Sequence, residues 1–148
     1  MSEFRHDPVS DRWVIIAPER AARPTDFPVV KREPRGGFCP FCEGNEDKTP
    51  PEITALRGGG TSPNSPGWQV RVVPNRFPAV KADEEGTEDG EPLSRRLPGA
   101  GRHEVIVESP RHVLAARDLP PADLQKVLRV YQARMDDAAR DTGIAYAA

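Results

Sequence analysis

Proline and glycine interrupt the chain so often between residues 19 and 67 that no long helix or central strand can form there. This stretch holds eight prolines and the glycine runs Gly36-Gly37 and Gly58-Gly59-Gly60. Each proline removes a backbone donor and fixes φ, and glycine weakens a helix or a strand. We therefore expect something other than regular backbone pairing to hold these residues. Over the whole chain, 17 prolines and 12 glycines among 148 residues exclude an all-helical bundle.

Three segments outside this stretch have the patterns of β-strands. Residues 13–16 form a short β-branched and aromatic run that predicts a buried strand. Residues 68–72 alternate apolar and polar side chains, which is typical of a half-buried strand, and Pro74 ends it. Residues 104–108 predict a third strand. Residues 82–101 are acidic and rich in glycine and proline, so we expect a solvated, mobile loop with little order.

The region after residue 118 predicts one helix, which opens at Pro120-Pro121 and is closed by Thr142-Gly143. Its apolar side chains recur at three- and four-residue steps and form one stripe: Leu124, Val127, Leu128, Tyr131, Met135 and Ala138. Residues 144–148 have the composition of the opening of a further strand. Because a strand needs a partner and a connection, we expect the C-terminal part of the domain to be missing from this chain. The exposed edge of that strand would then promote aggregation.

Charge and hydropathy narrow the classes of partner. The 21 basic and 23 acidic residues nearly balance, so no basic field favours a nucleic acid or an anionic membrane. No apolar run approaches the ~18 residues that a membrane span needs, and the N-terminus has no apolar stretch typical of a secretory signal. We therefore expect a cytoplasmic protein whose two cysteines are reduced.

Cys39-Pro40-Phe41-Cys42 has the spacing of a metal-binding knuckle, in which two thiolates three positions apart point at one ion. A structural zinc site needs four ligands, and the further nitrogen donors in this chain are His6, His103 and His112. His112 follows a predicted strand and a proline, a fixed position that suits a ligand, although the residues alone favour an ordinary surface or core histidine. Two ordinary buried thiols or a redox dithiol are the alternatives, although the loop residues on both sides of the motif disfavour the redox one.

Two arginines and an asparagine are candidates for binding a nucleotide. Arg20 and Arg23 follow the first predicted strand, and paired guanidinium groups suit a phosphate because each donates two hydrogen bonds and keeps its charge. A solvated basic turn is the alternative. Asn75 can read a base edge or cap a turn. The common phosphate-loop, dinucleotide, zinc-protease and serine-hydrolase motifs are missing from the sequence, so those functions lose support.

Four ordered blocks of the sequence together resemble the N-terminal domain of galactose-1-phosphate uridylyltransferases. The blocks are residues 4–24, 39–45, 73–80 and 103–112, and they span nearly the whole chain with similar spacing. The resemblance implies an α+β fold, a histidine-triad half-barrel of mainly antiparallel strands with a packed helix, of which residues 1–148 form the N-terminal portion. It also implies a homodimer. The implied reaction, in galactose metabolism, transfers UMP from UDP-glucose to galactose 1-phosphate through a uridylyl-histidine intermediate.

The resemblance also assigns roles to single residues. The implied zinc ligands are Cys39, Cys42 and His112. The implied nucleotide-binding residues are Arg20, Arg23, Phe41 and Asn75. Zinc is thus the implied cofactor. The two arginines match residues near the nucleotide phosphates, the asparagine matches a nucleotide contact, and the phenylalanine lies where an apolar side chain can line the base pocket. Arg76 is a departure, because some members have an acidic residue there.

One further departure bears on activity. The family's His-Pro-His segment, which carries the nucleophile and the fourth zinc ligand, has no match in this sequence. We therefore assign no catalytic residue in this chain, expect the chain alone to be inactive, and expect weakened zinc binding. Two alternatives to uridylyl transfer stay open. One is a related nucleotide phosphorylase of the ADP-glucose or dinucleoside tetraphosphate type, and the other is a non-catalytic module whose zinc knuckle and short sheet form a binding surface.

Overall fold

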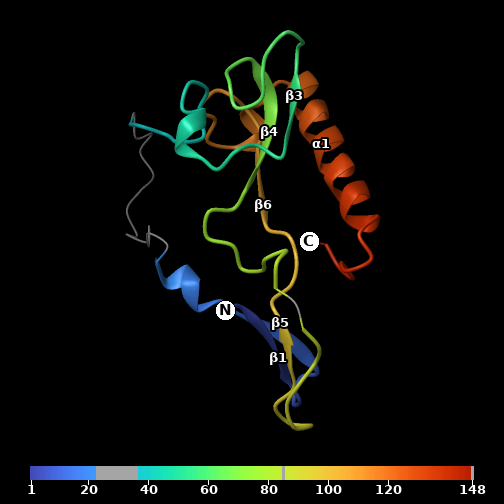
Figure 1. Ribbon diagram of the computed structural model, residues 1–148. Coiled ribbons are helices and arrows are strands. Elements are labelled where there is room, and N and C mark those ends of the chain that lie inside the picture. Colours follow the sequence, from blue (N-terminus) through green and yellow to red (C-terminus); the bar gives the residue numbers. More distant parts are fainter. Residues whose placement is uncertain (23–36, 85, 148) are drawn as a thin grey trace. The chain divides into compact units, whose positions relative to one another are not determined.

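The chain folds into two units, each built on a small antiparallel sheet (Figure 1). The structure is a computed structural model that describes residues 1–22, 37–84 and 86–147. The first unit comprises Met1–Asp26 and Phe77–His103, and the second comprises Phe27–Arg76 and Glu104–Ala148. The predicted α+β class is confirmed, since the described residues form two three-stranded antiparallel sheets and one α-helix.

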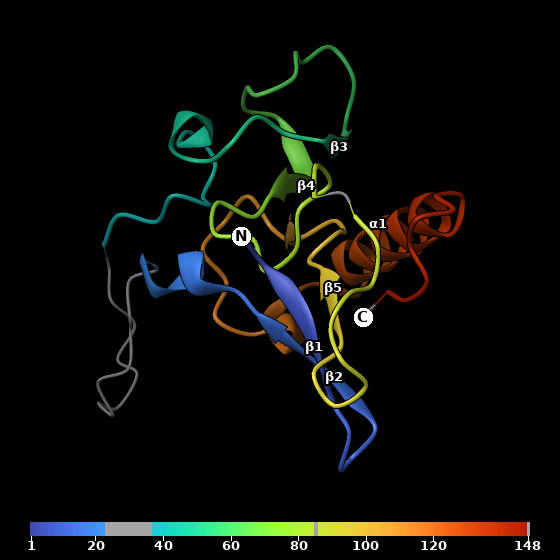
Figure 2. The ribbon, with the colours of Figure 1, turned by 60° about the horizontal axis from the view of Figure 1, so that its bottom comes forward.

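The sheet of the first unit has the strand order β2-β1-β5 (Figure 2). Its elements in chain order are β1 (Glu3–Asp7), β2 (Arg12–Ile16), the 3-10 helix η1 (Pro18–Ala22) and β5 (Arg96–Pro98). Asp7 holds the tight connection between β1 and β2, because its carboxylate accepts the Val9 amide at 2.9 Å and the Ser10 hydroxyl at 2.6 Å.

Two sequence predictions for this sheet are corrected. The strand expected at residues 13–16 is present as β2, but it is not buried: Trp13 and Val14 are 38% and 49% exposed. β2 is the edge strand, and the described part of the first unit contains no α-helix that could cover it. Residues 82–101 include β5, where little order was expected. A three-residue strand is too short to show a pattern, and it forms because Leu97 and its neighbours pair with β1.

The sheet of the second unit has the order β3-β4-β6, with β4 in the centre. Its elements in chain order are η2 (Glu46–Lys48), β3 (Thr54–Arg57), β4 (Trp68–Pro74), β6 (Glu104–Val107), η3 (Ala116–Asp118) and α1 (Pro121–Ala139). Val70 on β4 joins Leu119 and Val127 in the hydrophobic core, so α1 packs against the central strand. The strands predicted at 68–72 and 104–108 are therefore confirmed, and β4 ends at Pro74.

The prediction that the segment 68–72 is only half-buried is wrong. The side chains of Trp68, Val70 and Val72 are buried, and so is that of Arg71, which points to the opposite face of the strand. The face of β4 that carries Arg71 is covered as well, and the polar residue is tolerated because its guanidinium nitrogens donate to Glu52, Thr49 and Asn64.

The predicted helix is confirmed, with Pro121 in its first turn. Of the predicted apolar stripe, Val127 is buried, whereas the side chains of Leu124, Leu128, Tyr131 and Met135 are 37–56% exposed. None of the helices in the described part of the chain is long and apolar enough to cross a membrane. Residues 144–147 do not form the strand expected there. Ile144 and Gly143 instead donate their amides to Asp141, which closes a turn after the helix.

Candidate metal centre and adjoining pocket

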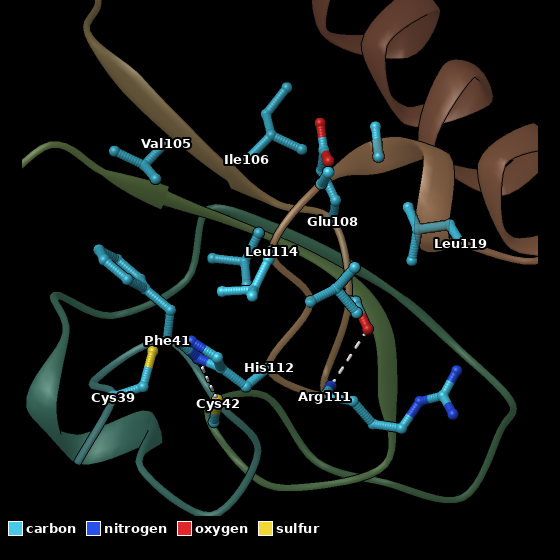
Figure 3. Close-up of a pocket in the computed structure, with 15 residues that line it drawn as sticks. Cys39, Phe41, Cys42, Val105, Ile106, Glu108, Arg111, His112, Leu114 and Leu119 are labelled. Atoms are coloured by element: carbon cyan, nitrogen blue, oxygen red, sulfur yellow. Dashed lines mark hydrogen bonds between the residues drawn. The ribbon is translucent and has the colours of Figure 1, made fainter. Parts of the chain in front are cut away.

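Two thiols and one imidazole of the second unit converge on a single point. The ligand atoms of Cys39, Cys42 and His112 all lie within 4.8 Å of one another. The Cys42 Sγ and His112 Nδ1 atoms are 3.7 Å apart and face each other (Figure 3). Tetrahedral zinc, with bonds of about 2.3 Å to sulfur and about 2.0 Å to nitrogen, requires a sulfur-to-nitrogen distance of about 3.5 Å. The donor types and their spacing therefore fit zinc.

The two cysteines are brought together by a tight turn over residues 39–45, here called the knuckle turn. The Cys42 amide donates to the Cys39 carbonyl at 3.3 Å, and the Asn45 amide donates to the Cys42 carbonyl at 3.2 Å. The Asn45 side chain also donates to the Cys39 carbonyl at 2.8 Å, so it closes the turn from its far end. Asparagine is favoured in such turns because its short amide bonds the local backbone.

The third ligand comes from a loop distant in sequence, just after β6. The Glu43 amide in the knuckle turn donates to the Pro110 carbonyl at 2.9 Å, which brings the His112 loop against the two cysteines. That loop is tightened by the Arg111 amide, which donates to the Ser109 hydroxyl at 3.1 Å. The position of His112 is therefore set by one main-chain contact with the knuckle turn and by the Ser109 side chain.

The carboxylate of Glu46 is hydrogen-bonded to the backbone of the knuckle turn. Glu46 is 7% exposed, and its carboxylate accepts hydrogen bonds from the Gly44 amide and from the Trp68 indole nitrogen. Burial acts to raise the pKa of Glu46, but the hydrogen bonds from Trp68 and Gly44 and the charge of Arg71 outweigh it and hold that pKa below its usual value. Glu46 is thus an ionised, buried acceptor.

The Cys42 thiol holds its proton more tightly than usual. Burial, followed by the neighbouring Cys39 thiol, raises the pKa of Cys42. The raised pKa disfavours the thiolate of Cys42 when no cation is bound, whereas a reactive redox thiol needs a lowered pKa. Zinc binds the thiolate form and displaces the thiol proton, so Cys42 suits a metal site better than a redox dithiol.

A pocket with a volume of about 360 Å³ adjoins the three ligands (Figure 3). Its lining comes from the knuckle turn, β6, the His112 loop and η3, and most of it is apolar. Phe41 forms part of the wall next to the cysteines, and its role in a base pocket stays a prediction. Glu108 on the rim accepts a hydrogen bond from the Tyr131 hydroxyl of α1, and this bond, with burial, raises the pKa of Tyr131 to about 12.

The other predicted site residues lie outside this cluster. Asn75 follows the end of β4 and is not among the residues that line the pocket. Arg20 lies in η1 of the first unit, where its guanidinium group donates to the Phe77 carbonyl at 3.0 Å. Arg23 lies outside the described residues. Nucleotide binding by these three residues stays a prediction.

Sequence reasoning missed the residues that support the knuckle turn. Asn45 and Glu46 come three and four positions after the CxxC motif, yet neither has a pattern of its own in the sequence. Glu46 becomes recognisable only because Trp68, 22 positions later, donates to it. Polar residues next to a metal-binding motif were the available signal, because ligands usually depend on such partners.

No protein-family model matches the sequence. The chain is 36% identical to an ADP-glucose phosphorylase from Arabidopsis thaliana, over 97% of this chain and 41% of that protein. It is 27% identical to a galactose-1-phosphate uridylyltransferase from Saccharomyces cerevisiae, over 95% of this chain and 39% of that protein.

Solved structures of the same two kinds of enzyme resemble the fold. One uridylyltransferase structure matches 97% of this chain and 37% of its own, with a TM-score of 0.65 and 27% identity. The crystal structure of an ADP-glucose phosphorylase from Arabidopsis thaliana with bound ADP-glucose matches 99% of this chain and 41% of its own, with a TM-score of 0.56 and 34% identity.

These comparisons confirm the resemblance found in the sequence. The chain is a homologue of a group of nucleotidyltransferases and phosphorylases. Within that group its relatives are galactose-1-phosphate uridylyltransferases and ADP-glucose phosphorylases, and the chain spans about two fifths of their length.

Proposed function

We propose that this chain contributes a zinc centre and the adjoining nucleotide pocket to an enzyme that transfers a nucleotidyl group from a nucleotide sugar. The observation that carries the proposal is the convergence of Cys39, Cys42 and His112 beside a largely apolar pocket, in a homologue of such enzymes. The pocket volume of about 360 Å³ suits a ligand the size of a nucleoside.

Each residue has a defined part in this proposal. Cys39, Cys42 and His112 hold zinc, which when bound ties the knuckle turn to the loop after β6 and so fixes two walls of the pocket. Phe41 gives the base an aromatic wall. Asn75 contacts the nucleotide by an amide hydrogen bond. Arg20, together with Arg23, neutralises the phosphates by charge-assisted hydrogen bonds.

The particular reaction that the sequence predicts is uridylyl transfer. In that reaction UMP passes from UDP-glucose to galactose 1-phosphate through a uridylyl-histidine. Residues 1–148 are then the N-terminal portion of a histidine-triad half-barrel, and the enzyme is a homodimer. The sequence has no His-Pro-His segment, so in this proposal residues 1–148 alone bind the nucleotide but do not turn it over.

ADP-glucose phosphorolysis is the second candidate. The observation that favours it is the 36% identity to an ADP-glucose phosphorylase, against 27% and 26% for two galactose-1-phosphate uridylyltransferases. A base pocket discriminates most strongly where it must satisfy a buried hydrogen-bonding group, so a uracil and an adenine pocket bind the other base poorly. Comparing the affinities for UDP-glucose and ADP-glucose therefore separates the two reactions.

Calorimetric titration of the zinc-loaded chain tests the proposal. We expect one of the two nucleotide sugars to bind, and we expect Phe41→Ala to weaken that binding about tenfold or more, since losing a stacked base costs roughly 1–3 kcal/mol. Phe38→Ala is the matched control, because Phe38 is exposed close to the knuckle turn and does not line the pocket. Zinc binding without affinity for either nucleotide sugar would favour the non-catalytic module instead.

A further inference from the structure

Glu46 is a buried carboxylate that the proposed reaction does not use. Its Oε1 and Oε2 atoms both accept the Gly44 amide at 3.1 Å, and Oε1 also accepts the Trp68 indole N–H at 2.7 Å. Gly44 belongs to the knuckle turn and has a φ of +90°, a backbone conformation that residues with a side chain rarely adopt. The carboxylate thus fixes the residue at which the turn reverses direction.

The partner that anchors this carboxylate lies on the central strand of the unit. Trp68 is the first residue of β4 and is 2% exposed, and β4 is paired on both sides. An indole N–H buried in this way needs an acceptor, and Glu46 supplies it. The hydrogen bond therefore connects the knuckle turn, which carries two metal ligands, to the central strand.

The backbone of Glu46 is held as well as its side chain. Its carbonyl accepts a hydrogen bond from the Thr49 hydroxyl at 3.1 Å. The Thr49 hydroxyl oxygen in turn accepts a hydrogen bond from the Arg71 guanidinium at 2.7 Å. Arg71 is buried on β4. Glu46 is therefore held through its side chain and through its backbone carbonyl. A displacement of its side chain would also displace Gly44 and the knuckle turn.

We propose that Glu46 is a positioning residue for the metal centre, which acts by holding the knuckle turn against Trp68 so that Cys39 and Cys42 face one point before the metal arrives. The proposal rests on the metal centre of the proposed function. A site that is ordered in advance loses less conformational entropy on binding, and partners outside the ligand set typically change metal affinity 10–100-fold.

Cobalt titration of the 148-residue chain tests this role, with absorption from thiolate-to-cobalt charge transfer and from the visible d–d bands as readouts. We expect Glu46→Ala to lower the Co²⁺ affinity about tenfold and to alter the d–d bands, although no ligand is removed. Glu46→Gln should recover part of the affinity, because its amide oxygen can still accept the Trp68 N–H. Trp68→Phe, which removes the donor and keeps an aromatic side chain, should weaken binding in the same direction.

A matched control separates positioning from a general loss of stability. Glu104→Gln breaks a partly buried ion pair in the same unit, where Glu104 accepts two hydrogen bonds of 2.7 Å from Arg134, and it does not touch the knuckle turn. This variant should lower the free energy of unfolding and leave the cobalt affinity and spectrum unchanged. The Glu46→Ala/Trp68→Phe double variant should bind cobalt no more weakly than Glu46→Ala, because both changes remove one contact.

Two results would overturn the inference, and they are distinguishable from a failure of the proposed function. Equal cobalt affinity and spectra for the unmodified chain and Glu46→Ala would refute the positioning role alone. An equal loss of cobalt affinity in Glu104→Gln would show that the effect of Glu46→Ala is a general loss of stability and not a loss of positioning. If the unmodified chain bound no cobalt, the metal centre itself would be refuted, and the role of Glu46 with it.

Discussion

The two units contain sheets of the same size, yet they bury them very differently. In the second unit the central strand is covered on both faces, and Val72 is fully buried. In the first unit the edge strand β2 leaves half of the Val14 side chain exposed. The predicted metal ligands all lie in the second unit, which contains the buried strand. The more tightly packed unit is therefore the one that has to hold a site in place.

The charged pairs of the two units differ in the same way. Glu52 is buried and accepts hydrogen bonds from Arg57 at 2.6 and 2.7 Å and from Arg71 at 3.0 Å. The pair of Glu88 and Arg95 in the first unit is about 40% exposed. An exposed pair competes with water and contributes little, whereas breaking a buried one leaves an uncompensated charge.

The chain also supplies a probe for each unit. It has two tryptophans, of which Trp13 lies in the first unit and Trp68 in the second. Trp13→Phe therefore leaves fluorescence that reports only on the second unit, and Trp68→Phe leaves fluorescence from the first. Unfolding of each unit can therefore be followed separately in these single-tryptophan variants.

The largest effect is expected from Glu52→Ala. Removing this carboxylate leaves Arg57 and Arg71 without their shared partner, so the free energy of unfolding of the second unit should fall by about 3 kcal/mol. Denaturant titration followed by Trp68 fluorescence in the Trp13→Phe background measures it. A loss similar to that of an exposed carboxylate would show that the buried network is not what holds this unit.

A matched pair of valine substitutions compares the two sheets directly. Val72→Ala on β4 should destabilise the second unit by about 2 kcal/mol, since it leaves a cavity in a fully packed strand. Val14→Ala on β2 should cost much less, because that side chain is half exposed. Equal losses, measured with the tryptophan of the respective unit, would remove the contrast in burial.

Acidification should destabilise the second unit in a defined pH range. Burial acts to raise the pKa of Glu52, but the hydrogen bonds from Arg57 and Arg71 outweigh it and leave that pKa below its ordinary value of 4.5. The pKa of Glu46 is lowered as well. The unfolded chain then binds more protons than the folded one, so this stability is complete above about pH 4.5 and is lost as the pH falls through the folded pKa values.

Denaturant titrations of the second unit between pH 7 and pH 3 measure this loss. Glu52→Gln removes one titrating group and should flatten the curve below its ordinary pKa. Stability that stayed constant down to pH 3 in the unmodified second unit would contradict the assignment of ionised, buried carboxylates.

The smallest effect is expected in the first unit. Arg95→Gln removes the exposed partner of Glu88 and the cation that lies 5.3 Å from the Trp13 ring centre. Solvent screens both interactions, so the unfolding midpoint reported by Trp13 should not change measurably. A large downward shift would show that surface charges, rather than the sheet, hold this unit together.

The sequence predicts those features that repeat along the chain or lie within a few residues. The helix pattern, the β4 and β6 strands and the CxxC turn are of this kind, and all are present. His112 was placed with the cysteines by its position after a strand and by resemblance, and the structure brings the three side chains together.

Features that depend on distant partners could not be predicted. The alternation of residues 68–72 gives a half-buried strand, because nothing nearby shows that Glu52 and Thr49 accept the Arg71 guanidinium. In the same way, the apolar run of β2 reads as buried, although its edge position in the sheet leaves it exposed. The burial of a strand depends on its tertiary neighbours, and a local sequence pattern does not show which neighbours those are.

Zinc content tests the central claim most directly. The purified chain, after dialysis against zinc and removal of the excess, should contain close to one zinc ion per chain by elemental analysis. Cys39→Ser, Cys42→Ser and His112→Ala should each lose it, while His103→Ala, a histidine of the first unit whose Nδ1 accepts the Ala79 amide, should retain it. A chain without zinc, or equal zinc in His112→Ala and the unmodified chain, would contradict the metal centre.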